Sequence, residues 1–299
     1  LGRRSELKQA LRNVRDRETG QTLNVVRERL EGLVAEREVA LAEAERARLD
    51  ETLDVTLPGE KPPRGHLHPL TQIVREVEDI MLGLGYEIVD SREVETVWHN
   101  FDALNQPLTH PSRSHRDTFY IDDDTLLRAH TSTGQIRVME TRQPPLYIAT
   151  PGRVYRRDTP SPRSTPNFHQ LEALVVDRGI TLADLRGTLV HFVREMFGPD
   201  RAVRVRTSYF PFTEPSVEFD VACFLCGGAG CTFCKYSGWF EMGGAGVVDP
   251  AVFENVGYDP EEWSGFAWGL GLDRIAAQRL GIPDIRMFWE NDLRMLRQF

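Results

Sequence analysis

Residues 152–176 read GRVYRRDTPSPRSTPNFHQLEALVV, and this stretch decides the fold of the chain. Two runs rich in strand-forming residues, 154–157 and 168–176, flank about nine residues dominated by Pro, Ser, Thr and Arg. The pattern predicts a β-hairpin closed by a long polar loop. Long surface loops held by a rigid scaffold often cover a ligand, so we expect a binding site here.

Side chains alternate along a strand, so one face of the hairpin is expected to collect every second residue. That face gathers Arg156, Asp158, Phe168, Gln170 and Glu172 if the register brings the strands together. A guanidinium, polar groups and an aromatic ring on one sheet face suit an anionic ligand that carries a ring, such as a nucleotide.

Composition and charge set the limits of the remaining analysis. The chain has 299 residues, of which 40% are hydrophobic and 27% charged, as in ordinary globular proteins. There is no apolar run of membrane-spanning length and no segment that resembles a signal peptide, which predicts a cytoplasmic protein without a membrane partner. The chain begins with Leu1 rather than Met, so we expect its N-terminus to be incomplete.

The N-terminal region, residues 1–57, is expected to form a helical coiled-coil arm. It lacks proline before Pro58 and places apolar residues at helical intervals, with a break expected near Thr19 and Gly20 to give an antiparallel helical hairpin. The net charge of the chain is −9, but residues 1–17 hold six Lys and Arg against two acidic residues, a balance of +4. This charge fits two interpretations equally: an arm that contacts nucleic acid, and a solvated coiled coil that serves only in packing.

Clustered Pro and Gly in residues 58–66 predict a linker, and residues 67–299 form the second domain. The pattern predicts helices at 68–84, 136–142, 182–197 and 272–280. Thr131 or Ser132 is expected to cap the second of these helices. Further strands are expected at 86–89, 94–97, 118–121, 126–129, 203–210, 217–221, 238–242 and 265–268. Because strands follow one another with few helices between them, we predict an α+β fold with a largely antiparallel sheet.

All the cysteines fall in residues 222–235, as Cys223, Cys226, Cys231 and Cys234, in a C-x2-C-x4-C-x2-C pattern with glycines between the pairs. Four thiolates at this spacing predict a structural Zn²⁺ site without an open coordination position. An iron–sulfur cluster is the minor alternative, and disulfides are disfavoured in a reducing compartment.

Four other stretches are dense in motif residues. They are LLRAHTSTGQ (126–135), SYFPFTEPSVEF (208–219), WFEMGGAGVVDP (239–250) and GFAWGLGLDRIAAQRLGIPDIR (265–286). Together with NFDALNQP (100–107) and the FHQLE hairpin strand, and in this order, they resemble the α subunits of bacterial phenylalanine–tRNA ligases, a family of class II aminoacyl-tRNA synthetases. The resemblance covers nearly the whole chain.

The resemblance implies a class II antiparallel sheet flanked by helices and preceded by the helical arm. It also implies ATP-dependent activation of L-phenylalanine to phenylalanyl-adenylate and its transfer to tRNA(Phe), with ATP and Mg²⁺, in an α2β2 assembly with a β subunit. The catalytic residues implied are Arg156, for the α-phosphate, and Arg274. The ATP-binding residues implied are Arg156, Asp158, Phe168, Glu241 and Arg274. Phe168 and Arg274 would stack on opposite faces of adenine, and Glu241 would also hold Mg²⁺ or ribose.

Residues implied for phenylalanine are His130, Ser132, Gln135, Gln170 and Glu172 for its ammonium and carboxylate, Phe210 and Phe212 for its ring, and Ala267 for the pocket floor. Because Phe210 and Phe212 are two positions apart and would share one face of a strand, they fit ordinary core packing equally well.

The hairpin loop departs from the family, since Ser161, Pro162, Arg163 and Ser164 replace its usual Asp-Ala-Thr-His. Arg163 is then a candidate to replace the cationic role of the loop histidine. Asp249, Asp273 and the pair Thr133-Gly134 also differ. Two alternatives stay open: a class II relative with altered amino-acid specificity, as in pyrrolysine and phosphoserine ligases, and a non-catalytic relative that binds tRNA or a regulator. Phe210 and Phe212 disfavour phosphoserine, whose anion needs cationic walls.

Overall fold

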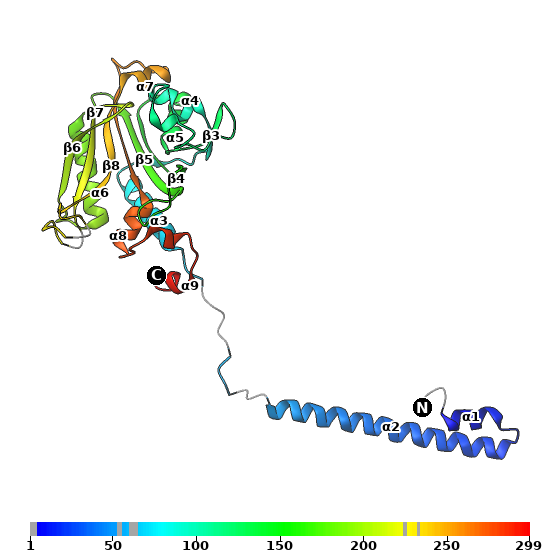
Figure 1. The fold of residues 1–299 in the computed structure, drawn as a ribbon. Coiled ribbons are helices and arrows are strands. Elements are labelled where there is room, and N and C mark those ends of the chain that lie inside the picture. Colours follow the sequence, from blue (N-terminus) through cyan, green and yellow to red (C-terminus); the bar gives the residue numbers. More distant parts are fainter. Residues whose placement is uncertain (1–4, 53–55, 60–64, 224–225, 232–233) are drawn as a thin grey trace. The chain divides into compact units, whose positions relative to one another are not determined.

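The structure is a computed structural model that describes residues 5–52, 56–59, 65–223, 226–231 and 234–299. The chain divides into two compact units, Leu1–Arg64 and Gly65–Phe299, coloured from blue to red along the sequence in Figure 1. Residues 60–64 of the predicted linker and the basic residues Arg3 and Arg4 lie outside the described part.

The first unit holds a short helix, α1 (Glu6–Asn13), that packs on a long helix, α2 (Arg17–Thr52). The predicted break near Thr19 and Gly20 is wrong, because both residues lie inside α2. The chain turns at residues 14–16, where the Asp16 carboxylate accepts the Thr19 N–H at 2.7 Å and caps the new helix. Apolar side chains of α2 such as Val25 and Leu33 are more than half exposed, at 65% and 53%.

The second unit is built on a seven-stranded sheet with the order β1-β4-β5-β9-β8-β7-β6. Only β1 runs parallel to its neighbour, so the predicted α+β fold with a largely antiparallel sheet is confirmed. The strands are β1 (Glu87–Ile88), β4 (Leu146–Tyr155), β5 (Asn167–Asp177), β6 (Val203–Phe210), β7 (Thr213–Ala222), β8 (Trp239–Val248) and β9 (Ser264–Gly271). A small second sheet pairs β2 (Val94–Thr96) with β3 (Thr125–Leu127).

The central hairpin is β4 and β5, with Val154 opposite Phe168 and Gly152 opposite Gln170. The second strand was predicted well, but β4 begins eight residues earlier than 154 and ends at Tyr155, so Arg156 follows the strand. The N–H of Arg156 still donates to the Pro166 carbonyl at 2.8 Å, which continues the hairpin alignment.

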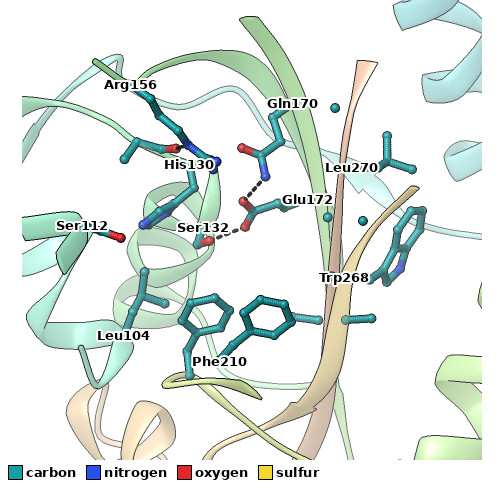
Figure 2. Close-up of a pocket in the computed structure, with 18 of the residues that line it drawn as sticks. Leu104, Ser112, His130, Ser132, Arg156, Gln170, Glu172, Phe210, Trp268 and Leu270 are labelled. Carbon is teal, nitrogen blue, oxygen red and sulfur yellow. Dashed lines mark hydrogen bonds between the residues drawn. The ribbon is translucent and has the colours of Figure 1, made fainter. Parts of the chain in front are cut away.

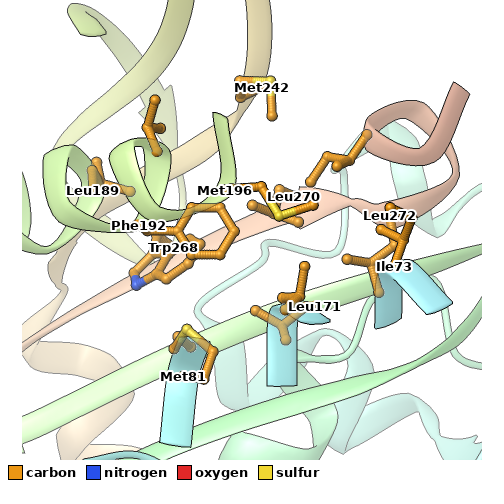
Figure 3. Close-up of a cluster of buried hydrophobic side chains, with 14 of the residues drawn as sticks. Ile73, Met81, Leu171, Leu189, Phe192, Met196, Met242, Trp268, Leu270 and Leu272 are labelled. Carbon is orange, nitrogen blue, oxygen red and sulfur yellow. The ribbon is translucent and has the colours of Figure 1, made fainter. Parts of the chain in front are cut away.

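Helices α3 (Pro69–Gly83), α6 (Leu182–Phe197) and α8 (Leu272–Arg279) cover one face of the sheet. Figure 3 shows their buried side chains around Trp268, which packs against Phe192 at 5.0 Å between ring centroids. Leu171 of β5 points into this core, so the alternate residues Gln170 and Glu172 point to the opposite face. On that opposite face a second buried cluster, which includes Ile136, Leu174 and Val176, covers part of the sheet, and the rest of the face carries the site.

Several element predictions need correction. Residues 118–121 form no strand, and Tyr120 makes only an isolated bridge to Leu126. Helix α5 (Ser132–Thr141) starts before residue 136, and the Thr131 side chain makes no capping bond. The predicted strands at 217–221, 238–242 and 265–268 are each longer in the structure. Elements missed in the sequence are α4 (Val97–Asn100), α7 (Pro250–Asn255), α9 (Leu293–Leu296) and the 3-10 turns η1 (Asp102–Leu104), η2 (Pro111–Arg113) and η3 (Ile285–Phe288).

In the part of the chain that the structure describes, every helix is too short or too polar to cross a membrane.

Candidate active site

A cavity of about 610 Å³ opens on the sheet face opposite α3 and α6, within the usual size range of ligand pockets. Every residue predicted from the sequence for ATP or phenylalanine lines it. These residues are His130, Ser132, Gln135, Arg156, Asp158, Phe168, Gln170, Glu172, Phe210, Phe212, Glu241, Ala267 and Arg274. The fold thus brings together groups that are as much as 144 positions apart in sequence, from residue 130 to residue 274.

At one end, which we call the buried end, polar groups surround the Glu172 carboxylate. Ser132 Oγ donates to Glu172 Oε2, and Gln170 Nε2 donates to Glu172 Oε1 at 2.9 Å (Figure 2). Glu172 is only 8% exposed. Both carboxylate oxygens are therefore held in place, while the Gln170 carbonyl oxygen and both ring nitrogens of His130 have no partner among the described residues.

Burial governs the charges here. It raises the pKa of Glu172, although Ser132 and Arg156 oppose the shift, and it lowers the pKa of Arg156. Burial, with the nearby Arg156 guanidinium, lowers the pKa of His130 to about 3. His130 is therefore neutral at physiological pH, and a buried carboxylate beside unpaired acceptors favours a cationic group such as an ammonium.

The aromatic wall of the buried end is formed by Phe210 and Phe212, whose rings stack at 5.8 Å with an interplanar angle of 11°. Phe210 ends β6, but Phe212 lies in the turn after it, so they do not share one strand face as predicted. Gly244 of β8 makes room for this wall, since a Cβ there would lie 2.7 Å from Phe210 Cζ. Both rings are half-buried and face the cavity, so the structure places them in the pocket wall rather than wholly in the core.

Arg156 links the two ends of the cavity. Its Nε donates to the Ala129 carbonyl at 3.0 Å, and its guanidinium carbon lies 5.2 Å from the centre of the Phe168 ring. It interacts electrostatically with Glu172 on one side and with Asp158 and Arg274 on the other. A guanidinium held in this way can meet an anionic group bound across the middle of the pocket.

The other end, which we call the open end, is lined by Asp158, Arg163, Glu241 and Arg274. The side chains of Glu241 and Arg274 are 56% and 47% exposed, with the closest charged atoms 4.0 Å apart. Arg274 is the third residue of α8, as predicted, and the preceding Asp273 is buried and accepts the His169 N–H at 2.5 Å. The charged groups of this end thus meet solvent and remain available to a ligand.

The hairpin loop folds over the open end in a tight turn. Ser161 N–H donates to the Ser164 carbonyl at 2.8 Å, and Ser164 Oγ donates to Asp158 Oδ2 at 2.8 Å. The loop tip is tied to the C-terminal region, because the Ile285 N–H donates to the Pro162 carbonyl at 3.1 Å. This turn exposes Arg163 while keeping it on the cavity lining.

Sequence reasoning missed some lining residues. Glu218 of β7 lines the cavity, and Gln106, His110, Ser112, Asp117 and Thr118 reach it from the segment before β3. Glu218 could have been found from its place in a predicted strand, where charged residues alternate with apolar ones. The second group comes from a segment that forms only short turns such as η2, and the sequence pattern does not indicate its path.

The four cysteines form a cluster at the end of the β7–β8 hairpin, away from the cavity lining. All four Sγ atoms lie within 4.8 Å of one another, and the Cys223–Cys231, Cys226–Cys234 and Cys231–Cys234 pairs are 3.9, 3.9 and 3.8 Å apart. A zinc–sulfur bond of about 2.3 Å in a tetrahedron implies sulfur atoms about 3.8 Å apart. The cluster therefore has the dimensions of a zinc–thiolate site.

Backbone donors prepare the cluster for negative charge. The N–H groups of Cys231 and Gly238 point at Cys234 Sγ from 3.1 and 3.3 Å. Burial acts to raise the pKa of Cys234, but these donors prevail and lower it to about 6. Gly238 has φ +75°, and a Cβ there would lie 2.2 Å from the Gly228 carbonyl oxygen, so only glycine allows this wrapping.

Comparison with known proteins agrees with this geometry. A family model described as the tRNA synthetases class II core domain (F) matches residues 52–299. The phenylalanine–tRNA ligase alpha subunit of Moorella thermoacetica is 51% identical over all of this chain and 91% of its own length. That of Heliobacterium modesticaldum is 52% identical over 94% of this chain and 83% of its own length. The chain belongs to the family of phenylalanine–tRNA ligase alpha subunits.

Structural comparison finds the same fold at much lower identity. A pyrrolysyl-tRNA synthetase from Desulfitobacterium hafniense superposes with a TM-score of 0.58 at 13% identity, over 88% of this chain and 84% of that one. This similarity concerns the fold alone. Membership of the class II family makes the chain an aminoacyl-tRNA synthetase subunit and implies the use of ATP and Mg²⁺.

Proposed function

We propose that the chain activates L-phenylalanine with ATP and transfers it to tRNA(Phe). The observation that carries the proposal is the shared cavity, in which one end offers a buried carboxylate beside an aromatic wall and the other offers exposed charges for a nucleotide. Glu172, held by Ser132 and Gln170, receives the substrate ammonium, and the phenyl ring lies against Phe210 and Phe212 over Ala267. His130 and Gln135 orient the carboxylate. The pairing of an anion with an aromatic wall favours phenylalanine over phosphoserine.

Arg156 acts where the two substrates meet. A carboxylate oxygen of phenylalanine bonds to the α-phosphorus of ATP, and the bond to the β-phosphate oxygen breaks to release pyrophosphate. The guanidinium of Arg156, fixed by the Ala129 carbonyl, stabilises the negative charge that gathers on the α-phosphate in the transition state. In the second step a terminal ribose hydroxyl of tRNA attacks the carbonyl carbon of the adenylate, and AMP leaves.

The open end holds the nucleotide. Phe168 and Arg274 take the two faces of adenine, and Asp158 completes the nucleotide site. Carboxylate oxygens are the ligands that Mg²⁺ prefers, and both Glu241 and Glu218 line this part of the cavity, so the donor set fits the metal. When bound, Mg²⁺ neutralises charge on the phosphates.

We infer that the cysteine cluster, Cys223, Cys226, Cys231 and Cys234, binds a structural Zn²⁺, with an iron–sulfur cluster as the minor alternative. The tetrahedral spacing of the sulfurs and the backbone donors to Cys234 support this assignment. Four thiolates leave no open coordination position, so the ion braces the β7–β8 hairpin. Elemental analysis of the isolated protein should find one zinc per chain, and a protein with neither zinc nor iron would contradict the site.

The assembly is part of the same proposal. We infer that residues 1–57 form an arm that reaches tRNA, that residues 58–66 link it to the catalytic domain of residues 67–299, and that this chain works in the cytoplasm with a β subunit as α2β2. The relatives are named alpha subunits of a tRNA ligase, and the basic residues of α1 and the start of α2 suit contact with a phosphate backbone.

The test is ATP–pyrophosphate exchange by this chain purified with its β partner, across the set of amino acids. We expect exchange with phenylalanine only. Exchange driven by another amino acid alone would establish the alternative of altered specificity, and the absence of exchange with every amino acid would favour a non-catalytic relative.

A further inference from the structure

A network of charged side chains lies behind the open end of the cavity, and its members Arg204, Arg206 and Asp220 have no role in the function proposed so far. It occupies the cavity-facing side of β6, β7 and β8, where Arg206 lies opposite Glu218 and Arg204 lies opposite Asp220. The intervening residues Val217 and Phe219 point into the helical core. These positions are therefore fixed by the sheet register and not by loop geometry.

A β-bulge brings one more carboxylate into the network. Gly243 pairs with Phe219, but the next pair along the strands is Glu241 with Asp220, so Met242 is the extra residue. Without the bulge, Met242 would oppose Asp220. Bulges often redirect a side chain beside a functional site, and here the bulge places Glu241 next to Asp220 at the cavity.

One guanidinium joins all three carboxylates. Arg206 Nε and Nη2 contact Asp220 at 2.6 and 2.9 Å, and Nη2 also lies 2.8 Å from Glu218 and 3.8 Å from Glu241. The hydrogen bonds that Arg206 donates to Asp220 raise the pKa of Arg206, so it stays charged. Among the described residues that line the cavity are Glu218 and Glu241 but not Arg206, so Arg206 can act on a ligand only through them.

Arg204 provides a built-in comparison. It is two residues away on the same strand, contacts the same Asp220 at 2.6 Å, and is 41% exposed where Arg206 is 40% exposed. Its guanidinium covers the Trp239 ring at 4.6 Å. In the described residues its ion pairing is with Asp220 and does not extend to Glu218 or Glu241.

We propose that Arg206 is a positioning residue that holds Glu218 and Glu241 in place for the Mg²⁺ that accompanies ATP. The proposal rests on the proposed function and extends it to a residue that does not touch the substrates. Two carboxylates that share a site repel each other, and a planar guanidinium between them offsets that repulsion while fixing their directions. A lysine would keep the charge but cannot contact three carboxylates with a fixed fork.

The experiment measures ATP binding by calorimetry, in the absence of amino acid, to the complex of this chain and its β partner. Parent and variant complexes are compared at saturating Mg²⁺ and again in EDTA. With Mg²⁺, Arg206→Met should raise the Kd for ATP about tenfold and Arg206→Lys about threefold, because the carboxylates lose their fixed directions. Arg204→Met should change it less than about twofold, because Arg204 is exposed and its ion pair with Asp220 does not extend to Glu218 or Glu241. In EDTA there is no Mg²⁺ for the two carboxylates to bind, so all variants should bind ATP within about twofold of the parent.

The affinity for L-phenylalanine, measured on the same proteins, shows that the variants are folded and should not change. The inference fails if Arg206→Met binds ATP with Mg²⁺ as tightly as the parent, or if Arg204→Met loses as much affinity for ATP as Arg206→Met. It also fails if Arg206→Met loses the same affinity for ATP in EDTA, which would indicate a general effect of charge. Failure of the proposed function is a separate outcome, seen when the parent itself shows no phenylalanine-dependent pyrophosphate exchange.

Discussion

The two ends of the cavity are built in different ways. At the buried end, Ser132, Gln170 and Glu172 bind one another, and the site is arranged before a substrate arrives. At the open end, Glu241 and Arg274 are about half exposed and their charges lie 4.0 Å apart. Under the proposed function, this difference predicts that the buried end selects the amino acid through fixed contacts, while the exposed charges of Glu241 and Arg274 settle when the nucleotide binds.

The largest effect is expected at Arg156, where the ends meet. Arg156→Ala should lower kcat for pyrophosphate exchange by about a thousandfold, because it removes a fixed donor to the transition state. Arg156→Lys should recover only part of the rate, since it keeps the charge without the planar fork. L-Phenylalanine binding and thermal unfolding of both variants show whether the fold survives. Exchange at the full rate by the alanine variant would disprove the mechanism.

The buried end should respond to the loss of one charge. Glu172→Gln should raise KM for phenylalanine about 10- to 100-fold, as expected for a hydrogen bond to a charged group, with little change in KM for ATP. Burial raises the folded pKa of Glu172 above 4.5, so the parent should lose affinity for phenylalanine as the pH falls through that raised value and the carboxylate takes up a proton. The glutamine variant should lack this dependence in a KM profile against pH. An unchanged profile would show that Glu172 does not receive the ammonium.

The floor of the buried end should respond to size. Ala267 faces the cavity from β9, and Ala267→Val adds two methyl groups where the phenyl ring is expected. We expect KM for phenylalanine to rise about tenfold while KM for ATP stays within about twofold. Steady-state exchange with each substrate varied in turn provides the measurement. Equal losses for both substrates would mean that the ring does not reach Ala267.

The smallest effect is expected in the exposed loop. Arg163→Ala should raise KM for ATP about threefold at low salt, because an exposed cation attracts phosphate weakly. Since salt screens exposed charges, the difference from the parent should shrink at high ionic strength. Ser161→Ala serves as a control in the same turn. A salt-independent loss would place Arg163 in a fixed, buried contact and would remove the contrast between the two ends.

Local patterns in the sequence predicted much of the catalytic unit. The alternation in residues 168–176 gave β5 and its polar face, and the apolar spacing of residues 182–197 gave α6 with its bounds. The first half of β4 was missed because Pro151 and Gly152 disfavour a strand. In the fold, β1 pairs with β4 only at Ile148 and Ala149, so no strand lies beside Pro151 on the side of β4 that faces β1. The missing N–H of Pro151 therefore costs no hydrogen bond between strands there.

Long-range geometry explains what the sequence could not reveal. Strand alternation pointed to the hairpin residues of the cavity, and resemblance to a family pointed to the other motif residues, whereas Arg206 and Glu218 were found by neither route. Their role depends on the register of β6 with β7 and on the bulge that turns Glu241 toward Asp220. A strand pattern shows which residues alternate, but it does not show where a neighbouring strand carries an extra residue.

The most direct test of the account is a crystal structure of this chain, with its β partner, bound to a non-hydrolysable analogue of phenylalanyl-adenylate. The account predicts the phenyl ring against Phe210 and Phe212, the ammonium on Glu172, and the α-phosphate mimic on Arg156. A ligand bound elsewhere, or bound here with its ring at the open end, would contradict it.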